Sequence, residues 1–61
     1  MLDNCHYNKI KLMHELSALL WFLKKHGIED AKKTGDKECI DFCNQLAQNI
    51  ADHIAQLQEM L

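Results

Sequence analysis

Residues 24–37 read KKHGIEDAKKTGDK, and they decide the fold because both glycines of the chain lie in this stretch. Gly27 follows two lysines and a histidine. This pattern is typical of a helix C-terminus, where cations suit the dipole and glycine adopts the left-handed cap conformation. The segment 34–36, Thr-Gly-Asp, is the clearest turn signal, and Asp36 is suited to cap a following helix. The stretch therefore predicts a joint over residues 27–36.

Outward from this joint, the sequence predicts two helices of similar length. The first spans about residues 4–26 and the second about residues 37–60, because the chain has no proline and most positions hold good helix formers. Matched helices with a short joint predict an antiparallel hairpin that occupies residues 1–61 as a single domain. An alternative lets the first helix continue through Gly27 to Lys33. We rank it second, because a glycine inside a helix costs about 1 kcal/mol.

The length and charge of the chain exclude several kinds of protein. A chain of 61 residues buries only about 60% of the surface that its unfolded form exposes, so such chains often gain stability by oligomerising. Seven lysines, no arginine and a net charge of −2 argue against binding to nucleic acid or to an anionic membrane surface. No apolar run in the sequence approaches the roughly 18 residues of a membrane span.

The first residues and the cysteines bear on where the protein acts. Residues 1–4, Met-Leu-Asp-Asn, lack the basic and then apolar layout of a secretory signal, so we expect a cytoplasmic protein. Three cysteines without such a signal are expected to be free thiols rather than a disulfide framework.

The two predicted helices differ in how much of their surface is apolar. The second has one stripe at helical spacing, which is typical of an amphipathic helix packed on one side. The first has a main stripe, formed by Leu2, Cys5, Leu12, Met13, Leu16, Leu19, Leu20 and Leu23. It also has a second stripe roughly opposite, formed by Ile10, His14, Ser17, Trp21 and Ile28 and widened by Tyr7, Ala18 and Phe22. Residues 18–23, ALLWFL, are apolar all the way round and predict burial on more than one side.

One helix cannot cover both stripes. The sequence therefore predicts an all-α, antiparallel helical hairpin that pairs with a second copy into a dimeric four-helix bundle. It leaves open whether the hairpins run parallel or antiparallel in the dimer. The predicted interface consists of Ile10, His14, Ser17, Trp21, Phe22 and Ile28. The sequence has no Gly-rich phosphate loop and no nucleophile beside an evident base. We therefore expect a non-enzymatic protein–protein interaction or regulatory module that acts as a homodimer, with room for a further partner protein.

The alternative function is a small metal- or redox-binding bundle. Cys39 and Cys43 lie four residues apart and can share a soft metal ion. His14 and His53, with Asp52 beside them, would lie near mid-height if the numbers of facing residues sum to about 63. However, neighbours in sequence such as Asp52 and His53 point about 100° apart, and cysteine often acts as a small hydrophobe. We therefore expect these groups to be structural and to hold no metal or cofactor.

Overall fold

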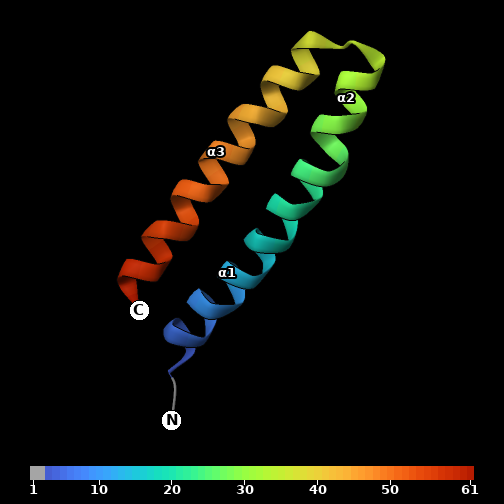
Figure 1. The fold of residues 1–61 in the computed structure, drawn as a ribbon. Helices are drawn as coiled ribbons and strands as arrows, with labels where there is room; N and C mark the ends of the chain where they lie inside the picture. The colour runs from blue at the N-terminus through green and yellow to red at the C-terminus, as the bar shows by residue number, and fades with distance from the viewer. Residues whose placement is uncertain (1–2) are drawn as a thin grey trace.

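The computed structural model describes residues 3–61, and it is a hairpin of helices. The elements are α1 (Asn4–Phe22), the π-helical turn η1 (Leu23–Gly27), α2 (Ile28–Thr34) and α3 (Lys37–Met60). The first three follow one another without a break and form one long arm, which lies antiparallel to α3 (Figure 1). The predicted all-α helical hairpin is thus confirmed, and no β-strand occurs within residues 3–61. Over the same residues, no helix has both the length and the hydrophobicity needed to cross a bilayer.

The turn between the two arms is formed by Gly35 and Asp36 alone. Gly35 has a φ of 73°, which is the left-handed conformation that glycine adopts without strain. Its N–H donates to the carbonyl of Lys32, and the N–H of Asp36 donates to the carbonyl of Ala31, both at 3.2 Å. These two bonds form a Schellman motif, which satisfies the last carbonyls of the helix. The Asp36 carboxylate then accepts from the N–H of Cys39 at 3.1 Å and caps α3, as predicted.

Gly27 lies inside the long arm rather than at its end. Its φ of −59° and ψ of −55° are right-handed helical values. The prediction that the first helix ends at residue 26 is therefore wrong, and the alternative that runs through Gly27 is correct to within one residue. Both glycines lie within the predicted joint, but the Schellman motif forms at the second. A Cβ added at Gly27 would lie 3.3 Å from Leu23 Cδ2 and 3.7 Å from Cys43 Sγ. An added Cβ would therefore crowd Leu23 of the same arm, while its contact with α3 would be an ordinary one.

The π-helical turn changes which face the following residues occupy. The N–H of Ile28 donates to the carbonyl of Leu23, five residues back instead of four. Each residue of such a wide turn advances by less than the about 100° of an α-helix. A stripe counted with regular spacing therefore does not continue across it. Ile28, which was predicted to lie on the outer stripe, is instead half-buried and packs against the core.

The core is small and lies in the half of the hairpin nearest the turn. Its buried members are Leu23, Ala31, Cys43, Ala47 and Ile50. Half-buried residues packed around it are Leu16, Leu20, Ile28, Cys39, Leu46 and Ile54. No described side chain is completely buried, and the hairpin measures 49 × 15 × 11 Å. Its radius of gyration of 14.2 Å exceeds the roughly 10.5 Å expected for a compact domain of this length.

The turn at Gly35 and Asp36 determines which residues of the two arms face each other and how far each arm extends. Gly27 lies against Cys43, so the numbers of facing residues sum to about 70 rather than the expected 63 or so. The long arm has 31 residues, Asn4–Thr34, and α3 has 24. The start of α1 consequently extends past the end of α3 (Figure 1). Leu2, which was assigned to the main stripe, lies outside the described residues.

Candidate interaction surface

Large apolar side chains lie exposed along the whole hairpin. They are Tyr7, Ile10, Leu12, Leu19, Trp21, Phe22, Phe42, Met60 and Leu61. Leu12 and Leu19 were predicted to pack within the hairpin, yet they are 50% and 44% exposed. A single facing helix covers only the centre of the main stripe, so the residues at its edge remain in solvent.

The part of the second predicted stripe that lies on α1 is present as an exposed line. Tyr7, Ile10, His14, Ser17 and Trp21, followed by Lys24 at the start of η1, are all exposed and are spaced at intervals of three and four residues. We call this line the α1 seam. Its spacing is the heptad repeat with which helices pack side by side. At about 100° per residue, the seam lies roughly a quarter turn from the residues that face α3. A helix of a four-helix bundle has its two contact faces at about this angle.

An aromatic cluster lies at the end of the seam. The His26 ring meets Trp21 edge-on and Phe22 at a tilt, with ring centroids 5.6 Å apart in both pairs. Trp21 is nevertheless 57% exposed and Phe22 52%. Edge-to-face packing of this kind orients the rings without removing them from water. The cluster therefore presents a pre-ordered apolar surface rather than a finished core.

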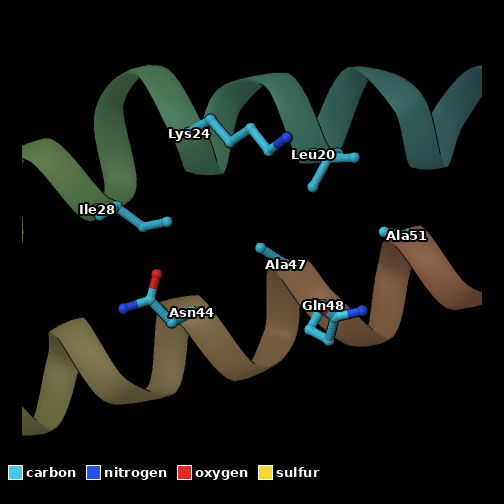
Figure 2. Close-up of a pocket in the computed structure, with 7 residues that line it drawn as sticks. All are labelled: Leu20, Lys24, Ile28, Asn44, Ala47, Gln48 and Ala51. Carbon is cyan, nitrogen blue, oxygen red and sulfur yellow. The ribbon is translucent and has the colours of Figure 1, made fainter.

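A shallow groove of about 230 Å³ lies beside the seam, between the long arm and α3. Its residues are Leu20, Lys24, Ile28, Asn44, Ala47, Gln48 and Ala51 (Figure 2). Leu20 and Ile28 point toward α3, while Lys24 runs along the helix toward Leu20 (Figure 2). The floor is therefore apolar and the rim polar. Lys24 belongs to both the groove and the α1 seam, so the two features share one side of the hairpin.

The predicted interface residues divide into two groups in the structure. Ile10, His14, Ser17, Trp21 and Phe22 are exposed on α1, whereas Ile28 belongs to the core region. Phe42 was not among the predicted interface residues, and it is 66% exposed on α3. Its exposure could have been predicted, because Phe42 lies outside the apolar stripe of that helix and next to Asp41.

The two cysteines of α3 lie on its apolar side, whereas Cys5, which was predicted to lie on the main stripe of the first helix, does not pack there. Cys43 is buried, Cys39 is half-buried, and Cys5 is exposed near the start of α1; all three are free thiols. The sulfur atoms of Cys39 and Cys43 are 4.0 Å apart. The hydrogen bond with Cys43 raises the pKa of the Cys39 thiol, and desolvation and the nearby Asp36 carboxylate raise it further. Cys39 is therefore poorly suited to act as a thiolate nucleophile.

The remaining metal candidates do not form a cluster. His14 and His53 are both exposed, and His53 Nδ1 lies 3.0 Å from the side-chain oxygen of Gln56. Asp52 accepts a bond from Gln48 at 3.0 Å. Within residues 3–61, no three His, Cys, Asp or Glu side chains converge to hold a metal ion. The later turn raises the sum of facing residue numbers from about 63 to about 70, and this register still leaves His14 and His53 within one helical turn of each other in height.

Comparisons of the chain with protein-family models, curated proteins and solved structures find no match. Its function is therefore inferred from its own surface. The hairpin exposes 4808 Å², against about 4,100 Å² expected for a folded chain of this size. The excess, roughly 700 Å², is close to the about 800 Å² that each partner buries in a standard protein interface.

Proposed function

We propose that this chain is a non-enzymatic interaction module that works as a homodimer, with the α1 seam as its self-association surface. The observation that carries the proposal is the exposure of Trp21 in line with Tyr7 and Ile10 on a helix that already has one partner. Large apolar side chains that lie exposed along one face of a helix support an interaction site there. Two hairpins that share this surface form a four-helix bundle.

The size of the chain supports a second copy as the partner. Among the described residues of a single chain, the core has five buried members, and α1 contributes none of them. Small scaffolds of this kind are commonly completed by oligomerisation, and two-fold dimers are the most frequent soluble homo-oligomers. Burying one large aromatic side chain stabilises by about 1.5–3 kcal/mol, which is a large share of the stability of so small a fold.

A role in binding other proteins follows from what the seam leaves uncovered. Leu12, Leu19 and Phe42 do not belong to it and are exposed in the hairpin. A dimer built on the seam therefore retains apolar side chains on its outer surface. Amphipathic helices of partner proteins are recognised by surfaces of this type, through anchors spaced three and four residues apart.

Sedimentation analysis over a concentration series tests the proposal. We expect a dimer at micromolar concentration, and we expect Trp21→Ala to shift it toward monomer by at least about tenfold in dissociation constant. Phe42→Ala is the matched control, because it removes an equally exposed aromatic side chain that lies outside the seam. A wild-type chain that stays monomeric would contradict the proposal, and so would equal effects of the two substitutions.

A further inference from the structure

We propose that, in the homodimer proposed above, α1 packs antiparallel against α1 of the second copy, with the two-fold axis passing near residues 15–16. The inference rests on that dimer and adds which helices meet, in which direction and in which register. Each step below follows from the side chains of the α1 seam and of the groove beside it.

The first step is that α1 meets α1 rather than α3 of the second copy. On the side of the hairpin where the seam lies, α3 presents Asn44, Gln48 and Ala51. If the seam packed on this surface, Trp21 would bury amide groups against its apolar ring, and an amide buried without a hydrogen-bond partner is costly. When α1 packs on α1, Trp21 can instead meet an apolar side chain, and the amides of α3 are not buried beneath its ring.

The second step is the direction. In a parallel pair each residue faces its own copy, so Lys24 would meet Lys24 and two like charges would lie side by side. In an antiparallel pair, residues at the same height have numbers that sum to a constant. That arrangement separates the two Lys24 side chains to opposite ends of the seam. Charge therefore favours antiparallel packing.

The third step is the register. If the numbers of facing residues in the two α1 helices sum to about 31, every residue of the seam lies beside another residue of the seam. Each pair then joins the two different core positions of the heptad repeat, as in antiparallel helix pairs. Trp21 then meets Ile10 of the second copy, and His14 meets Ser17, whose hydroxyl can bond to the imidazole. Lys24 meets Tyr7, and a cation over an aromatic ring is a favourable contact. Two-fold symmetry repeats each pair, so every seam residue has a compatible neighbour.

The overhang of α1 fits this arrangement. The first turns of α1 extend past the end of α3 and have no helix of their own chain beside them (Figure 1). In the antiparallel dimer these turns lie alongside Lys24 of the second copy, next to the groove between its arms. The segment that lacks a neighbour in one chain therefore covers the groove that is open in the other.

The natural cysteine at position 5 provides a direct test. Cys5 is exposed, whereas Cys43 is buried and Cys39 is half-buried with a raised pKa, so a nitroxide reagent labels Cys5 first. Mass spectrometry verifies a single label per chain. Double electron–electron resonance then measures the distance between the two labels of a dimer. With the axis near residues 15–16, the labels lie about 30 Å apart along the helices, at 1.5 Å per residue. Parallel α1 helices would place them within about 20 Å, because neighbouring helix axes are only 8–10 Å apart.

A second label position makes the result independent of fraying at the N-terminus. Lys33 is exposed at the other end of the arm, and Lys33→Cys in a Cys5→Ser chain moves the label there. The antiparallel dimer predicts about 50 Å between these labels. Distances of about 30 and 50 Å support the inference. Two short distances in a sedimenting dimer overturn the antiparallel arrangement and leave the dimer standing. A chain that sediments as a monomer and gives no distance overturns the proposed function itself.

Discussion

The two halves of the hairpin differ in how completely the chain packs against itself. Within residues 3–61, the five buried side chains all lie in the half next to the turn, where Gly27 lies against Cys43. The other half, formed by α1 and the end of α3, holds half-buried residues such as Leu16, Ile54 and Leu57 but no buried ones. The closed half therefore holds the hairpin together, whereas the open half leaves large apolar side chains such as Tyr7 and Ile10 exposed.

The largest expected effect lies in the closed half. Leu23→Ala removes a buried side chain at the centre of the core and should destabilise the protein by about 2–5 kcal/mol, as large-to-small core substitutions do. For a small hairpin this approaches its total stability, so the helical circular dichroism should be largely lost at room temperature. Leu12→Ala, at a half-exposed position of the open half, is the matched control and should retain the helical signal. Equal losses in the two variants would mean that the halves are equally packed.

Thiol labelling compares the halves without changing the sequence. Cys5 in the open half should react with iodoacetamide at the rate of a free thiol, whereas Cys43 should react at least an order of magnitude more slowly, because it must wait for the core to open. Cys39 should react at an intermediate rate at pH 8, since its raised pKa leaves less thiolate. A raised pKa also means that the folded state holds this proton more tightly. The protonated Cys39 thiol therefore contributes fully to the stability of the folded state at neutral pH. This contribution is lost as the pH rises through the pKa that Cys39 has in the folded state. Simultaneous labelling of Cys5 and Cys43 would contradict the burial of the core.

The two glycines mark the two places where the first helical arm could have ended. The arm continues through Gly27 and ends before Gly35. Gly35→Ala places a Cβ in the left-handed conformation and should destabilise the protein by about 1–2 kcal/mol, measured by urea unfolding. Gly27→Ala should change stability by less than about 1 kcal/mol, because the gain in helix propensity is offset by the close contact with Leu23. If Gly27→Ala were the more damaging substitution, the helix would end at Gly27.

The glycines also show which parts of the fold follow from local sequence. The cap at Asp36 and the turn at Gly35 were predictable, because each depends on residues within one helical turn. The choice between Gly27 and Gly35 was not, since both carry the same local signal and the packing of Leu23 against Cys43 decides between them. The π-helical turn has no sequence signature in this chain, so the burial of Ile28 could not be foreseen. The hydrogen bond that spans five residues instead of four was enough to move Ile28 from the predicted interface to the core region.

The candidate surface was predictable to a different degree. The spacing of Ile10, His14, Ser17 and Trp21 located most of the exposed seam, because these four residues lie within one regular helix, upstream of the wide turn. The groove was not foreseen, since it needs the register between the arms, and that register depends on where the turn falls. His14 and His53 were predicted at a similar height, and the observed register keeps them there, but both side chains are exposed and neither belongs to a group of three metal ligands within residues 3–61.

The smallest expected effect compares the two helix caps. Asp3 accepts from the N–H of His6 at 2.7 Å at the start of α1, and Asp36 accepts from the N–H of Cys39 at 3.1 Å at the start of α3. Removing a cap of this kind typically costs about 1 kcal/mol. Asp36→Ala should show this loss in full, because the first turn of α3 cannot fray without disturbing the core. Asp3→Ala should destabilise the monomer by only a few tenths of a kcal/mol, because the first turn of α1 has no neighbour there and unfolds locally at little cost in free energy.

In the proposed antiparallel dimer that turn lies against the second copy. Urea unfolding of Asp3→Ala should therefore show a larger loss at high protein concentration than at low, whereas the loss for Asp36→Ala should be independent of concentration. A constant small loss for Asp3→Ala in a dimer would mean that the overhanging turn makes no contact with the second copy.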